Sequence, residues 1–149
     1  MAKQDDLAFA TAFQVEHREM GNLLQRVRHA TADGCDWSHD AAREARTAIE
    51  ALERRLRQHF AQEEEGGYLE QALAAAPRLS RPAAELLRQH PAMLAQASTA
   101  LSTAREAVSD STRWSVLKQQ VEELMSALVG DERSESAIVQ EAFNTGFEH

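Results

Sequence analysis

The sequence predicts an all-α protein, an up-down-up-down antiparallel four-helix bundle, and three observations support this fold class. Alanine occurs 27 times among the 149 residues, whereas valine and isoleucine together occur nine times, so the composition favours helices over strands. Only three prolines and six glycines interrupt the chain. Turn signals separate four long segments, and short connections between long helices make neighbours antiparallel. The length suits one core, which predicts a single domain over 1–149.

The turn signals set the bounds of the four expected helices. These signals are Asp33-Gly34-Cys35-Asp36, the stretch from Pro77 to Pro82, and Ser109-Asp110-Ser111. The expected helices are 5–32, 38–76, 81–109 and 112–144. A serine stands near three of the helix starts, where its hydroxyl can accept a hydrogen bond from the first turn. The expected N-caps are therefore Ser38, Ser80 and Ser111.

Each expected helix carries a seam of apolar residues, spaced by three and four, that also contains ionisable side chains. The first seam is Phe13, His17, Met20, Leu24 and Val27. The second is Ile49, Leu52, Leu56, His59 and Glu63. The third is Leu86, His90, Met93 or Leu94, Ala97, Leu101, Ala104 and Val108. The fourth is Leu117, Val121, Leu124, Leu128, Asp131, Glu135, Ile138 and Ala142. Every helix thus directs an imidazole or a carboxylate toward the core.

A bound metal explains this coincidence, because burying isolated ionisable groups is costly and a cation compensates several at once. Taken singly, a histidine on a seam could be a hydrogen-bonded core residue, and Asp131 with Glu135 could mark a frayed helix end. Their convergence from four helices favours a metal centre. Oxygen and nitrogen donors without thiolate suit iron, with manganese and zinc as alternatives, and four helices offer ligands for two adjacent ions. The candidate ligands are His17, His59, Glu63, His90, Asp131 and Glu135.

At these residues the sequence resembles the hemerythrin-like, or HHE cation-binding, domains over nearly its whole length. His17 matches the first-helix ligand of that family, and His59-Phe60-Ala61-Gln62-Glu63 matches its H-x-x-x-E motif. His90 matches the third-helix ligand, and Glu135 matches the carboxylate of the fourth helix. The resemblance implies a hemerythrin-like bundle around a non-haem di-iron site. It implies that His17 and His59 serve one ion and His90 and Asp131 the other, with Glu63 and Glu135 bridging.

Two departures from the family pattern concern the ion near His90. Oxygen-carrying members have a second histidine where this chain has Leu94, and a histidine where it has Asp131. The resemblance therefore implies sensing or handling of iron, oxygen, nitric oxide or peroxide rather than oxygen transport. No substrate pocket or catalytic acid is evident, which favours a role other than that of an enzyme. The alternative hypothesis is a metal-poor interaction module with a water-filled polar core.

Two helix breakers lie close to the candidate ligands. Pro91 follows His90 and cannot donate a hydrogen bond to the carbonyl of Leu87, so we expect the third helix to start late or to kink there. The pair Gly66-Gly67 should loosen the second helix just after Glu63. The other histidines, His29, His39 and His149, are expected at the surface.

Charge and cysteine content exclude several classes of protein. Lys and Arg number 16 against 24 Asp and Glu, a net charge of −8, and no basic cluster suggests nucleic-acid binding. No apolar run is long enough to span a membrane, and the first residues lack a secretory pattern, so we expect a cytoplasmic protein. The lone Cys35 allows neither an internal disulfide nor a thiolate metal site.

Overall fold

The fold is a bundle of four long α-helices with one short helix inserted, in a computed structural model that describes residues 2–65 and 68–147. Side chains are described for residues 12–65 and 69–143. The long helices are α1 (Ala2–Ala30), α2 (His39–Glu64), α4 (Ser80–Ala107) and α5 (Trp114–Phe147). The short elements are α3 (Tyr68–Ala75) and the 3₁₀ turns η1 (Pro77–Leu79) and η2 (Ser111–Arg113).

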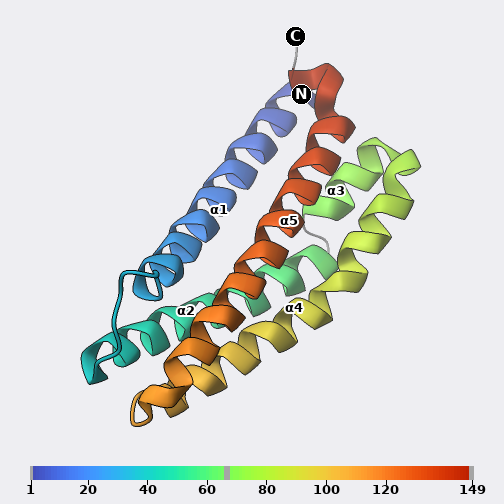
Figure 1. The fold of residues 1–149 in the computed structure, drawn as a ribbon. Helices are drawn as coiled ribbons and strands as arrows, with labels where there is room; N and C mark the ends of the chain where they lie inside the picture. The colour runs from blue at the N-terminus through green and yellow to red at the C-terminus, as the bar shows by residue number, and fades with distance from the viewer. Residues whose placement is uncertain (1, 66–67, 148–149) are drawn as a thin grey trace.

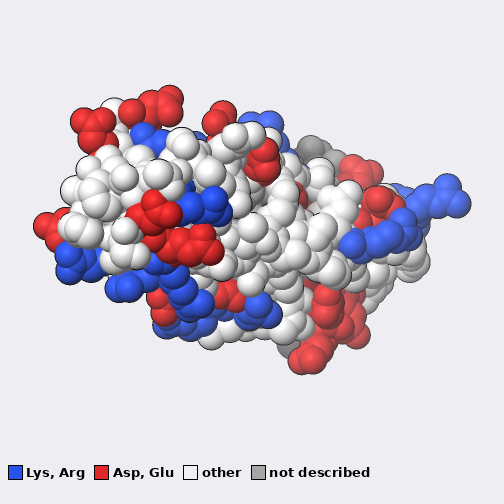
Figure 2. All heavy atoms as spheres, turned by 60° about the horizontal axis from the view of Figure 1, so that its bottom comes forward, with Lys and Arg blue, Asp and Glu red and all other residues white. Residues whose placement is uncertain are grey.

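Figure 1 shows the up-down-up-down course of the long helices, with α1 beginning and α5 ending at the same end of the bundle. The predicted fold class is therefore confirmed, and the described residues contain no β-strand. None of the helices in the described part of the chain has the length and apolarity needed to cross a bilayer. On the face in Figure 2, acidic and basic side chains lie interspersed.

The second predicted helix, 38–76, was too long. The structure ends α2 at Glu64 and begins the separate helix α3 at Tyr68, while Gly66 and Gly67 lie outside the described residues. Glycine weakens a helix by about 1 kcal/mol relative to alanine, so two in succession favour a break. The short helix then turns away from the line of α2 and packs beside α5 (Figure 1).

The third predicted helix does not start late, because α4 begins at Ser80 and contains Pro91. Pro91 is exposed, so water can hydrogen-bond to the Leu87 carbonyl that the proline leaves free. Figure 1 shows α4 changing direction where its colour passes from green to yellow. The proline therefore accompanies a bend within one helix rather than a helix start.

One of the three expected serine caps is correct. The Ser38 hydroxyl accepts a hydrogen bond from the Ala41 amide at the start of α2. Ser80 instead donates to the Pro77 carbonyl from the first residue of α4, so it caps nothing. Asp110 takes the cap position expected of Ser111 and accepts from the Thr112 amide. An aspartate carboxylate serves as well as a serine hydroxyl at this position.

A layer of polar side chains divides the core into two apolar clusters. The larger cluster includes Phe60, Met93 and Leu128, and the smaller one includes Leu86 and Ile138. Between them along α4 lies His90, and along α5 lie Asp131 and Glu135. The seam positions expected to carry ionisable groups inside the bundle are therefore buried on α2, α4 and α5. His29 and His39 are exposed as expected, and His149 lies outside the described residues.

Candidate metal centre

The polar layer consists of five almost fully buried side chains from three helices. Their exposed fractions are 3% for His59, Glu63 and Asp131, 1% for Glu135 and 0% for His90. The pairs His59/Glu63 on α2 and Asp131/Glu135 on α5 are each separated by four residues, which places both members of a pair on one helix face. We call these five residues the buried centre. All five were predicted as ligands from the sequence.

Glu63 lies between the two histidines of the buried centre. Its Oε1 is 2.5 Å from the Nε2 of His59, and its Oε2 is 3.4 Å from the Nε2 of His90. Neither Glu63 oxygen has a hydrogen-bond partner within the described residues, because these short approaches lack hydrogen-bond geometry. A carboxylate with one oxygen beside each of two imidazole nitrogens is suited to bridge two cations.

The His59 side of the centre is well partnered. The His59 Nε2 is 3.3 Å from the Oε2 of Glu135, and its Nδ1 is 3.1 Å from the Oε1 of Glu16 on α1. Arg55 donates a hydrogen bond to the other oxygen of Glu16. The imidazole is thus held by a carboxylate on each side. Such a carboxylate behind a histidine fixes the ring orientation and directs the other nitrogen at a metal.

The His90 side is poorly partnered. The His90 Nε2 lies 3.3 Å from Asp131 Oδ1, without hydrogen-bond geometry. Both nitrogens of His90 and both oxygens of Asp131 are buried and have no hydrogen-bond partner within the described part of the chain. The His90 ring stacks on Phe60, with centroids 3.7 Å apart and planes 7° from parallel. Buried polar groups rarely stay unpartnered, and the atoms of His90 and Asp131 are of the types that bind a divalent cation.

Without a metal, protons neutralise the His59 side. Burial opposes charge on His59, but its close contacts with the carboxylates of Glu135 and Glu63 outweigh that effect and raise the pKa of His59 to about 11. Burial raises the pKa of Glu63 to about 9, and the negative charge of Glu135 adds to that effect while His59 opposes it. Burial also works against ionisation of Glu135, but His59 and Glu63 hold its pKa below the usual value.

His17, the sixth predicted ligand, lies at the edge of this arrangement. Its Nδ1 is 2.5 Å from the Oε2 of Glu132, and its side chain is 40% exposed. Burial, together with the charge of Glu135, raises the pKa of Glu132 to about 7. The expectation that His17 occupies the core face of its helix is thus not met. The assignment of His17 and of the five buried residues as metal ligands stays a prediction.

Four residues around the buried centre were not predicted from the sequence: Glu16, Arg55, Phe60 and Glu132. One signal for Glu16 was present, because a seam through Glu16, Met20, Leu23 and Val27 has the same three-and-four spacing as the seam through His17. Met20 and Val27 belong to both seams and are buried. The helix is rotated so that Glu16 rather than His17 faces His59. Only the packing of α1 on α2 decides between the two.

The donor set fits a divalent cation. One ligand atom each from His59, Glu63 and Glu135 lie within 4.8 Å of one another, and the same holds for Asp131, Glu132 and Glu135. The two groups share Glu135. Imidazole nitrogen and carboxylate oxygen suit iron, manganese or zinc.

Comparison with known proteins agrees with this chemistry. A family model described as the hemerythrin HHE cation binding domain matches residues 8–142, a range that includes the whole buried centre together with His17, Glu16 and Glu132. No significant match was found among curated proteins or among solved structures.

Proposed function

The chain belongs to the hemerythrin HHE cation-binding domain family, and from this membership and the buried centre we propose that it is a non-haem di-iron protein. Its role would be the sensing or handling of iron or of oxygen, nitric oxide or peroxide. The observation that carries the proposal is Glu63, whose two carboxylate oxygens each approach a different buried histidine. Two ions bridged by carboxylates are what four-helix carboxylate proteins hold in this position.

His59 and His90 would each bind one ion, with Glu63 between the ions. Glu135 would serve the ion near His59, and Asp131 the ion near His90, since each carboxylate lies 3.3 Å from the Nε2 of that histidine. An iron pair supplies reversible electron transfer and an affinity for small oxygen- or nitrogen-containing ligands. Leu94, half-buried against the apolar core, leaves the His90 ion with few nitrogen donors, which supports a role other than reversible oxygen transport.

The alternative, an interaction module that holds protons and water instead of metal, is favoured by the His59 side alone. There a raised histidine pKa and a raised Glu63 pKa let protons neutralise the charges. On the His90 side it would need buried water to partner the atoms of His90 and Asp131, whereas a single cation would compensate all of them. We therefore favour the metal-binding function.

Metal quantification after anaerobic Fe(II) reconstitution tests the proposal. We expect about two iron ions per chain after desalting, a rise in melting temperature, and oxo-bridged di-iron absorption bands after oxidation. Parallel reconstitution with Mn(II) and Zn(II) identifies the preferred metal. A metal content below about 0.2 per chain for all three ions, without thermal stabilisation, would overturn the proposal and favour the interaction module.

A further inference from the structure

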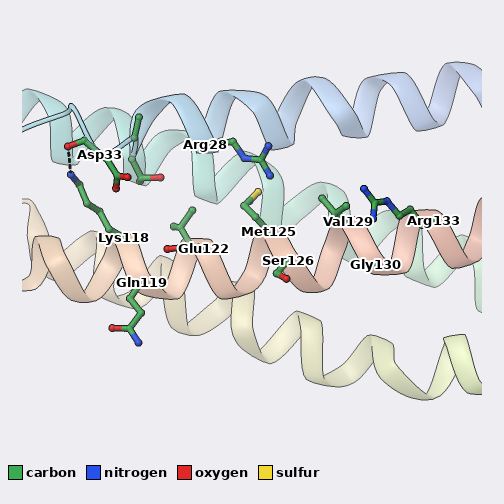
Figure 3. Close-up of a pocket in the computed structure, with 13 residues that line it drawn as sticks. Arg28, Asp33, Lys118, Gln119, Glu122, Met125, Ser126, Val129, Gly130 and Arg133 are labelled. Carbon is green, nitrogen blue, oxygen red and sulfur yellow. Dashed lines mark hydrogen bonds between the residues drawn. The ribbon is translucent and has the colours of Figure 1, made fainter.

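The buried centre lies behind a surface cavity between α1 and α5. This cavity has a volume of about 420 Å³, and its wall includes His17, Gly21, Glu132 and Arg133. A larger cavity of about 990 Å³ opens farther along the same two helices and shares Val129 and Arg133 with it. Figure 3 shows Arg28, Met125, Val129 and Arg133 in the space between the two helices of this larger cavity. The smaller cavity is lined by an imidazole and a carboxylate in direct contact, those of His17 and Glu132.

Glu132 connects the smaller cavity with the buried centre. Its side chain is 14% exposed and lines the cavity, and one of its oxygens belongs to the group in which Asp131, Glu132 and Glu135 each offer a ligand atom within 4.8 Å of the others. Asp131 is 3% exposed, and both of its oxygens lack hydrogen-bond partners in the described part of the chain. Carboxylate oxygens therefore form a series that begins with Glu132 at the cavity wall and leads to Asp131 and Glu135 inside the bundle.

His17 adds a nitrogen donor at the outer end of this series. Its Nδ1 is 2.5 Å from Glu132, and its half-exposed ring stands on the same cavity wall. A divalent cation loses its water ligands reluctantly, so a path on which protein donors replace them one after another lowers the cost of reaching a buried site. The half-exposed pair and the buried carboxylates provide such a path.

We propose that Glu132 and His17 form a loading site, at which a divalent cation from the α1–α5 cavity binds first and from which it passes to Asp131 and Glu135. This inference rests on the proposed metal-binding function and extends it to how the ions arrive. It gives His17 a role at the surface end of the path, where the structure places it. It also assigns Glu132, which matches no expected ligand, a role in the rate of metal uptake rather than in the final coordination.

Gly21 also lines the smaller cavity, one helical turn after His17 on α1. It lies inside α1, where glycine disfavours the helix, and a Cβ at this position would meet no atom within 4 Å. Gly130 on α5 is equally open but lines the larger cavity. The two glycines offer a matched pair of substitutions that fill one cavity or the other without a clash at the backbone.

Stopped-flow uptake of Co(II), followed by its visible absorption, tests the loading site. We expect Glu132→Gln to slow uptake about tenfold while the final cobalt content stays at the wild-type value. Glu122→Gln is the control, because Glu122 is an exposed carboxylate on the same helix that lines only the larger cavity. Arg133 is exposed and its charge repels a cation at the cavity, so Arg133→Gln should speed uptake.

The two glycine variants test the route independently of charge. Gly21→Leu should slow Co(II) uptake with an unchanged final content, whereas Gly130→Leu should leave the rate at the wild-type value. Equal uptake rates in wild type, Glu132→Gln and Gly21→Leu would overturn the loading site alone. A reduced final content in Glu132→Gln would also overturn it, because Glu132 would then be a permanent ligand. A wild-type protein that takes up no cobalt, iron, manganese or zinc overturns the proposed function and the loading site together.

Discussion

The two sides of the buried centre differ in how their histidines are held. On the His59 side, the Nδ1 lies 3.1 Å from Glu16 and the Nε2 lies 3.3 Å from Glu135. On the His90 side, neither ring nitrogen has a hydrogen-bond partner within the described residues, and the ring is held by stacking on Phe60. Both sides are equally buried. The difference therefore lies in hydrogen bonding and charge.

This contrast indicates that the two sides depend on metal to different degrees. An unpartnered buried polar group costs about 1–3 kcal/mol, and more when it is charged. A proton on His59 compensates that side, since its pKa is raised to about 11 by its contacts with Glu135 and Glu63. The described residues offer Asp131 and His90 no such partner. We infer that the His59 side keeps its arrangement without metal, whereas the His90 side needs an ion.

The largest loss of bound metal is expected when Glu63 is substituted, because this residue contacts the histidines of both sides. Glu63→Ala removes the oxygens that approach His59 and His90 and should lower the iron content from about two ions per chain to below about 0.2. Metal analysis after anaerobic reconstitution measures this. Glu64→Ala is the matched control, since Glu64 is exposed on the same helix. Equal losses in both variants would mean that the helix face is wrongly assigned.

Substitution of Asp131 should affect metal binding only on the His90 side. Asp131→Asn keeps the size of the side chain but removes the negative charge 3.3 Å from His90, so the protein should retain about one ion, bound near His59. Iron analysis gives the number, and the loss of di-iron absorption bands confirms that a single ion remains. If the variant still bound two ions, His90 and Glu63 alone would hold the second one, and the contrast between the sides would be wrong.

Substitution of Glu16 should affect metal binding only on the His59 side, and less strongly than substitution of Asp131 affects the His90 side. Glu16→Gln leaves a neutral acceptor for the His59 Nδ1, so the variant should bind the same amount of metal with an affinity lowered about 10- to 100-fold. Competition with a chelator of known affinity measures the change. Glu19→Gln is the control, because Glu19 contacts the same Arg55 at 3.3 Å but is 59% exposed. A similar loss in the control would assign the effect to Arg55 instead.

The sequence was sufficient to predict the bundle and the burial of five ionisable residues, because these depend on local periodicity. Leu128, Asp131, Glu135 and Ile138 follow one seam, and a straight helix with such a seam has one way to face the core. The end of α2 was missed although Gly66-Gly67 signalled it, since a weakened helix ends only where packing favours a new direction, here that of α3.

The contacts between helices could not be predicted in the same way. Glu16 and His17 are neighbours on α1, and a small rotation of that helix decides which of them faces His59. The stacking of Phe60 on His90 depends likewise on how α2 and α4 meet. A single sequence contains the spacing along each helix but not the rotation of one helix against another.

The last prediction concerns the unmodified protein and the number of protons that it releases when metal binds. Metal-free protein at pH 7 should hold a proton on the His59 Nε2, because the pKa of His59 is raised to about 11, and one on Glu63, whose pKa is raised to about 9. A metal ion needs both donors deprotonated, so Zn(II) loading in a weakly buffered solution should release about two protons per chain at pH 7. At pH 9, where Glu63 is half ionised before loading, the release should fall toward about one and a half. A pH indicator measures both values, with EDTA-saturated zinc as the control. A release of about one proton at both pH 7 and pH 9 would mean that Glu63 is ionised before the metal arrives, and the His59 side would then depend on metal as strongly as the His90 side.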